Sequence, residues 1–331
     1  MLSKETRLFV WGGAAISGSG LFWSIPIANA LTSIAAIAGL ILIISRLGYT
    51  RAIVMSLAAI ILSAMIGIAL DSIDYGMISA GVFTIAVIAP GIAMGMASRS
   101  LSSPVKTILY GCIPIIILFA LMLVFYTDLI SGMTQIIRST NASVVGRIED
   151  NPGLAGMLSQ RYGSDIEGRE KFLEEIDSLV TFLIKIMPGM IMVGFLAIIV
   201  ISLMLAGRVG AIMGVMIPRL RPFYLWRASE WWLLPTFAGL VLVIFGGIEF
   251  WRYFGGNILI VTGHVYAFSG LAYVESFFRR LAIPMFIRIV TYVLMLLISL
   301  PSIVFMAVLG LMDSRFNFRR ENAEPGENNT E

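Results

Sequence analysis

Long apolar stretches separated by short polar breaks run along most of the chain. A helix needs about 20 apolar residues to cross the hydrocarbon core of a bilayer. Nine stretches approach or exceed that length: residues 7–25, 27–45, 52–70, 77–97, 105–126, 179–206, 232–249, 257–278 and 281–311. The pattern predicts an all-α, polytopic membrane helix bundle with about eight or nine transmembrane helices.

Two of these stretches allow a second interpretation. Lys4 and Arg7, an apolar run and then Ala28-Asn29-Ala30 resemble a cleavable signal peptide. Because another apolar stretch begins at once, an uncleaved first helix is the better interpretation. The last stretch, residues 281–311, is too long for one straight span and contains Pro301. It crosses either once as a kinked helix or twice as two short ones, which leaves the side of the C-terminus open.

Polarity divides the chain into four parts. Residues 1–126 and 179–312 hold the transmembrane helices, residues 127–178 form an acidic loop, and residues 313–331 form a polar tail whose composition is typical of disorder. Within the loop, apolar residues recur at helical spacing from Asp165 to Ser178. This pattern predicts an interfacial helix that continues into the next span. The loop is either a solvated connector or a lid or docking surface.

The distribution of basic residues predicts the orientation. Lys and Arg accumulate in cytoplasmic loops of membrane proteins. With the N-terminus in the cytoplasm, the arginine-rich loops fall inside, and residues 127–178, with nine acidic and five basic residues, fall outside. The tail is a conflict, because nine crossings place it outside, whereas Arg315, Arg319 and Arg320 favour the cytoplasm.

Composition excludes several classes of function. Hydrophobic residues make up 58% of the chain and charged residues 13%, about half the charged fraction of a soluble protein. A net charge of +3 gives no reason to expect a nucleic-acid partner. Cys112 is the one cysteine, and His264 the one histidine, so no disulfide and no site built on several cysteines or histidines is available. P-loop, HExxH and GxSxG motifs are absent from the sequence, so we expect no enzyme, cofactor or metal.

Polar residues inside apolar spans are candidates for function, because they are costly there. Asn257, His264 and Glu275 are spaced by seven and eleven residues, which places them on one helix face. They either line a path for a ligand or proton or make separate hydrogen bonds between helices. Glu275 lies one turn from Arg279, so an ion pair at the membrane edge is an alternative. Three other ionisable residues lie near enough to span ends to reach the interface: Lys185, Glu249 and Arg288.

Small residues and arginines suggest how the helices associate. Gly91 with Gly95, and Gly210 with Gly214, form GxxxG motifs, which let helix backbones approach closely. The segment 208–227 predicts an interfacial helix. Its arginines predict a docking surface for a cytoplasmic partner, and anchoring to anionic lipid is the alternative. The residues proposed for docking are Arg219, Arg221 and Arg227.

The C-terminal half carries an ordered series of short motifs. They are Arg219-Leu220-Arg221-Pro222-Phe223, Trp226-Arg227-Ala228-Ser229, Ser269-Gly270-Leu271-Ala272, Phe277-Phe278-Arg279-Arg280 and Gly310-Leu311-Met312-Asp313. This layout resembles the YybS-like family of bacterial multi-pass membrane proteins, a domain of unknown function, most clearly over residues 155–320. That family is distantly similar to the substrate-binding S components of energy-coupling-factor transporters. The resemblance implies a bacterial cytoplasmic membrane and a substrate cavity that opens outward.

Two functions follow as the main hypotheses, and a membrane enzyme that uses buried carboxylates is the remaining alternative. The first is a subunit that binds or transports a small solute, energised by a separate cytoplasmic ATPase or working with another membrane subunit. The second is a non-transporting membrane scaffold or assembly factor. An outward cavity lined by polar positions between residues 257 and 275 would favour the first, and a closed bundle the second.

Overall fold

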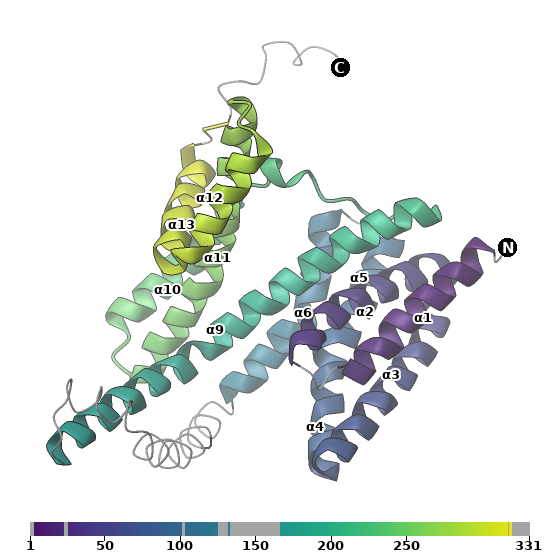
Figure 1. The fold of residues 1–331 in the computed structure, drawn as a ribbon, viewed down its shortest axis with the longest axis horizontal. Helices are drawn as coiled ribbons and strands as arrows, with labels where there is room; N and C mark the ends of the chain where they lie inside the picture. The colour runs from purple at the N-terminus through teal and green to yellow at the C-terminus, as the bar shows by residue number, and fades with distance from the viewer. Residues whose placement is uncertain are drawn as a thin grey trace. The chain divides into compact units, whose positions relative to one another are not determined.

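The computed structural model describes residues 3–22, 26–100, 103–124, 132, 166–316 and 318–319, and all regular structure in these ranges is helical. The helices are α1 (Lys4–Phe22), α2 (Pro26–Leu47), α3 (Tyr49–Leu70), α4 (Ile73–Phe83), η1 (Thr84–Ile88), α5 (Ala89–Arg99), α6 (Pro104–Val124), α9 (Ile166–Met213), η2 (Phe223–Leu225), η3 (Glu230–Trp232), α10 (Leu233–Phe245), α11 (Glu249–Arg280), α12 (Met285–Leu297) and α13 (Ser299–Phe316) (Figure 1). The all-α prediction is confirmed.

Each predicted apolar stretch coincides with one or more helices, but not every helix is long and apolar enough to cross a bilayer. Five helical segments of the described chain meet that requirement: Asn29–Leu47, Tyr49–Leu70, Ile73–Arg99, Glu174–Met213 and Glu249–Arg280. A sixth is the bent pair Met285–Met295 and Leu300–Phe316, if it is counted as one span. A helix of 13 residues such as α10 covers only about 20 Å. The structure therefore supports five or six spans, and the count of eight or nine stays a prediction.

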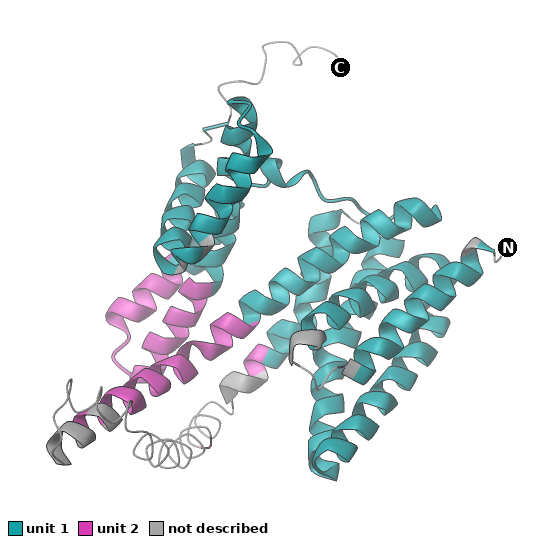
Figure 2. Cartoon of the chain, in the orientation of Figure 1, with its two compact units in different colours: residues 1–118, 192–236, 261–331 teal, residues 119–191, 237–260 magenta. Residues whose placement is uncertain are grey.

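The chain forms two compact units, coloured separately in Figure 2. Unit 1 comprises residues 1–118, 192–236 and 261–331, and unit 2 comprises residues 119–191 and 237–260. Helices α6, α9, α10 and α11 each contribute residues to both units.

Helix α2 is the centre of the N-terminal part of unit 1. Helices α1, α3 and α5 pack against it, and the run from Leu40 to Ile44 is fully buried. Gly91 and Gly95 make the contact with α5 possible, because a Cβ atom there would lie 2.5 Å from Leu40 Cδ1 and 2.7 Å from Ile44 Cδ1. The predicted packing role of this GxxxG motif is confirmed.

A π-helical turn, η1, joins α4 and α5 into one span. Its hydrogen bonding is wider than that of an α-helix, since the N–H of Ala89 donates to the carbonyl of Thr84, five residues earlier. Pro90 follows directly. A proline lacks the N–H, and its ring collides with the carbonyl four residues earlier in a regular α-helix. The wider turn gives that ring room, which is how this span accommodates a proline.

The end of α9 differs from the prediction in two ways. Gly214 follows the last helical residue with φ of 71°, and the N–H of Val215 closes the helix on the carbonyl of Gly210 at 2.8 Å. Gly214 therefore ends the helix and does not form the second half of a packing motif. The prediction of an interfacial helix over residues 208–227 is wrong. Beyond Gly214 the segment is irregular apart from the three residues of η2, because Pro218 and Pro222 oppose helix formation.

The last helices form a hairpin against α11. Helix α12 starts beside the end of α11, where the Tyr292 hydroxyl donates to Glu275. The two segments of the hairpin are bent by 114°, and α13 returns along α11, where Gly310 crosses Gly270 so closely that a Cβ on either would overlap a backbone carbonyl of the other helix. The end of α13 thus reaches the side where α11 ends. Whether residues 281–311 cross the membrane once or twice stays a prediction.

Large apolar side chains face outward along the helices. Trp231, Phe245 and Phe286 are 75–78% exposed, and apolar surface on this scale marks contact with a membrane. The acidic loop, residues 127–178, lies largely outside the described residues. Its predicted second-half helix is present from Ile166 and continues without interruption through the span to Met213, as the periodicity indicated.

Candidate functional site

Asn257 of α11 is a buried bridge to α9 within unit 2. Its side chain is 2% exposed. The Oδ1 atom accepts the N–H of Gly189 at 2.6 Å, and Nδ2 donates to the carbonyls of Lys185 and Tyr253, both at 2.8 Å. Gly189 N–H and Lys185 C=O are the two groups that pair with each other in a regular α-helix. Next to Pro188, the side-chain amide of Asn257 therefore takes the place of this backbone hydrogen bond and binds both groups. Unpaired backbone groups would be costly inside a membrane.

Lys185 also joins α9 to the beginning of α11. Its side chain is only 15% exposed and forms an ion pair with Glu249. The Nζ atom lies 3.3 Å from the Tyr253 hydroxyl and 4.3 Å from the centre of that ring. The sequence predicted that Lys185 and Glu249 would each reach the interface separately. The structure pairs them, and Lys185, Glu249, Tyr253 and Asn257 form one polar cluster, called the α9–α11 cluster below.

Glu275 lies in a separate cluster in unit 1. It forms ion pairs with Arg279 at 2.7 Å and Arg288 at 3.2 Å, and it accepts the Tyr292 hydroxyl at 2.6 Å. The Glu275 side chain is 12% exposed. The ion pair with Arg279 is the alternative that the sequence analysis named for this carboxylate. Two arginines on one carboxylate leave the cluster with a net positive charge.

The structure does not gather Asn257, His264 and Glu275 around one ligand. They share a face of α11, but the helical rise separates Asn257 from Glu275 by about 27 Å. Asn257 is engaged by α9, Glu275 by α12, and His264 is half-buried between them in the sequence. Each of the three residues has different neighbours along α11.

A buried polar node fixes the segment after α9 to α11 and to the end of α13. The N–H of Ala228 donates to Ser269 Oγ at 3.0 Å, and the carbonyl of Ala228 accepts Ser314 Oγ at 3.0 Å. The guanidinium of Arg319 pairs with the fully buried Asp313 at 2.9 Å, although in the described part of the chain neither carboxylate oxygen meets hydrogen-bond geometry.

Arg319 extends the node to the carbonyls of Tyr224 and Ser269, at 2.7 and 3.3 Å. Several of the motifs quoted from the sequence thus meet at this node, which we call the Asp313 node.

The three arginines predicted for docking differ in their surroundings. Arg219 and Arg221 are exposed. Arg227 donates to the backbone carbonyl of Ser314, so its guanidinium also holds the segment in place. Arg279 lies over the Tyr224 ring at 4.4 Å. Arg279 of α11 therefore lies against the segment that carries the other three arginines. We call Arg219, Arg221, Arg227 and Arg279 together the arginine platform.

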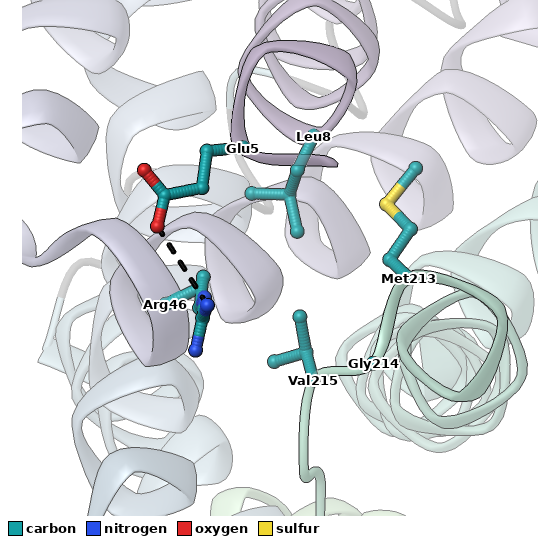
Figure 3. A pocket seen from close by; sticks show the side chains of 6 residues that line it. All are labelled: Glu5, Leu8, Arg46, Met213, Gly214 and Val215. Atoms are coloured by element: carbon teal, nitrogen blue, oxygen red, sulfur yellow. Dashed lines mark ion pairs between the residues drawn. The ribbon is translucent and has the colours of Figure 1, made fainter. Parts of the chain in front are cut away.

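A pocket of about 140 Å³ lies in unit 1, lined by Glu5, Leu8, Arg46, Met213, Gly214 and Val215 (Figure 3). It brings together the start of α1, the end of α2 and the end of α9. Glu5 and Arg46 lie together on one side of the pocket, with a carboxylate oxygen 3.7 Å from Nη2, and Met213 and Val215 lie on the other side. The predicted orientation of these helix ends in the membrane stays a prediction.

Metal binding receives no support from the side chains that the structure describes. Among them, no three histidine, cysteine, aspartate or glutamate residues come together in a way that could hold an ion.

The sequence analysis missed the pairing of Lys185 with Glu249 and the burial of Asp313. A Pro-Gly pair in one apolar span and an asparagine in another indicate a disturbed helix and a side chain able to bind its free backbone groups. This is a signal for the contact between α9 and α11, although not for the ion pair itself. Asp313 carried no comparable signal, since an acid near the end of the last span is typical of a solvated helix end.

Comparison with known proteins gives a family and nothing finer. No curated protein and no solved structure matches the chain. A family model described as "Predicted membrane protein (DUF2232)" matches residues 14–314, nearly the whole chain. The chain belongs to this family of predicted membrane proteins, whose function its description leaves open.

Proposed function

We propose that this protein is a membrane-embedded scaffold whose arginine platform docks an acidic protein partner at the cytoplasmic surface of a bacterial inner membrane. The observation that carries the proposal is the exposure of Arg219 and Arg221 on a segment whose following residues are tied down at the Asp313 node. A segment that is already fixed loses less conformational entropy when a partner binds. Exposed guanidinium groups recognise carboxylates in a bidentate geometry.

The positive-inside rule supports the cytoplasmic location of the platform. Its arginines lie on loops that alternate with acidic ones. The hairpin α12–α13 brings the Arg315 end of the chain to the same side. Repulsion among these like charges is relieved when an acidic surface covers them.

The test reverses the two exposed charges together. In cells, the Arg219→Glu, Arg221→Glu double variant should lose proteins that cross-link to and co-purify with the unaltered chain, while membrane insertion stays normal. Arg252→Glu is the matched control. Arg252 is also an exposed arginine, but it lies in the first turn of α11, whereas Arg279 of the arginine platform lies in the last turn. An unchanged set of partners in the double variant refutes docking. Loss of bound anionic lipid without loss of proteins instead supports lipid anchoring.

A second candidate rests on the α9–α11 cluster. A buried lysine paired with a glutamate in a proline-containing membrane helix is typical of solute and ion pathways. On this hypothesis the chain is a subunit that binds or transports a small solute, similar to an S component and energised by a separate ATPase. Bound small molecules in protein purified in mild detergent, identified by mass spectrometry and lost in Lys185→Met, support it.

The two functions can be separated because they depend on different residues. Arg219→Glu with Arg221→Glu leaves the α9–α11 cluster untouched, and Lys185→Met leaves the arginine platform untouched. Retention of partners by Lys185→Met together with their loss in the arginine variant favours the scaffold.

A further inference from the structure

The pocket beside Glu5 and Arg46 combines opposite charges with an apolar floor. Leu8 is 1% exposed and Val215 is 9% exposed, and both line the pocket with Met213 (Figure 3). The volume of about 140 Å³ is several times the space that one water molecule needs. The two charged side chains are more than half exposed, so a ligand can reach them.

The ion pair in this pocket is loose. The carboxylate oxygen of Glu5 and Nη2 of Arg46 are 3.7 Å apart, beyond the 2.7–2.9 Å of a charge-assisted hydrogen bond. Each group therefore retains hydrogen-bonding capacity toward a third group. Exposed pairs of this kind contribute little to stability, which leaves both side chains available for binding.

The position of the pocket defines the environment of its ligand. Three helix ends meet there: the first turn of α1, the last turn of α2 and the last turn of α9. The ends of membrane helices lie in the headgroup region of the bilayer. The C-terminus of α9 also carries the negative end of its helix dipole, which attracts a cation.

We infer that this pocket binds the headgroup of a zwitterionic phospholipid with a primary ammonium, of the phosphoethanolamine type. The phosphate pairs with Arg46, the ammonium donates hydrogen bonds to Glu5, and the glycerol end contacts Leu8, Met213 and Val215. An anionic headgroup without an ammonium leaves Glu5 facing a negative charge. A quaternary ammonium has no N–H to donate to the carboxylate, so a choline headgroup binds more weakly.

The test measures lipid binding to the full chain in detergent by native mass spectrometry. Phosphatidylethanolamine, phosphatidylglycerol and phosphatidylcholine with the same acyl chains are compared. We expect the ethanolamine lipid to be retained about fivefold to tenfold better than the other two. Soluble phosphoethanolamine should compete with the ethanolamine lipid, because the pocket recognises the headgroup. If it does not compete, the acyl chains are responsible for binding and the inference is overturned.

Three variants locate the binding site, with a fourth as control. Glu5→Gln and Arg46→Gln should each remove the preference for the ethanolamine lipid, whereas Arg51→Gln, an exposed arginine in the first turn of α3 outside the pocket, should keep it. Met213→Phe fills the pocket without changing a charge and should also reduce binding. It therefore tests the pocket even if the charge variants fail to fold. Equal retention of all three lipids by the unaltered protein, or full preference in both charge variants, overturns the inference.

Discussion

Two membrane spans of this protein, Ile73–Arg99 and the span within α9, accommodate an internal proline in different ways. In the first, Pro90 follows a π-helical turn, so the helix adjusts within its own backbone. In α9, Pro188 is followed by Gly189, whose N–H donates to Asn257 of another helix. The span with Pro90 accommodates its proline within one helix, whereas α9 needs a side chain of α11. Integrity of α9 at this point therefore depends on α11.

The largest effect is expected from Gly189→Ala. A Cβ atom at this position would lie 2.7 Å from Asn257 Oδ1 and 3.1 Å from the Asn257 carbonyl oxygen. The methyl group both separates the helices and displaces the bridging amide, so we expect a loss of about 3 kcal/mol in the free energy of unfolding, measured by SDS titration in mixed micelles.

Gly194→Ala is the control on the same helix. A methyl group added there would meet no neighbouring atom of the described residues within 4 Å. Equal stability of the two variants would show that α9 and α11 do not meet at Gly189.

A smaller effect is expected from Asn257→Leu. The substitution keeps the number and branching of the side-chain heavy atoms and removes the partner of Gly189 N–H and of the Lys185 carbonyl. The expected loss is about 1 to 2 kcal/mol in the same titration, at the upper end for hydrogen bonds between membrane helices. Ser202→Ala is the control, because its buried hydroxyl donates to the Ile198 carbonyl of its own helix. A loss no larger than that of the control would contradict the bridge.

The smallest effect is the coupling between each proline and Asn257. Pro188→Ala restores a backbone N–H beside the bridge, so Asn257→Leu should cost about 0.5 to 1 kcal/mol less in that background. Pro90→Ala should leave the cost of Asn257→Leu unchanged within about 0.5 kcal/mol, because its turn is self-contained. Coupling of equal size at both prolines would remove the distinction between the two helices.

The helices themselves could be predicted from the sequence because their signal is local. Apolar length, polar breaks and prolines located the long helices of the described chain, and the spacing of Gly91 and Gly95 predicted a close contact that the structure contains. The continuation of the loop helix into α9 was also correct. These features depend on neighbouring residues along the chain, which periodicity reports directly.

The partners of the polar side chains could not be predicted, because they lie far away along the chain. Lys185 and Glu249 are separated by 64 residues, and each alone resembles a side chain that reaches the interface. Asn257, His264 and Glu275 share one face of α11, as their spacing predicted. That spacing carried no information on which helices cover the face. The prediction of an interfacial helix over residues 208–227 was wrong because Pro218 and Pro222 oppose helix formation there.

The Asp313 node also has a consequence for biosynthesis. Its parts are made in the order Ala228, Ser269, Asp313 and Arg319, and the ion pair brings together the last two. A ribosome that stops before Arg319 releases a chain with a fully buried carboxylate and no counter-ion, which is costly. The residues that follow α13 therefore contribute to the stability of the helices before them, and a chain cut before Arg319 should be less stable than the full chain.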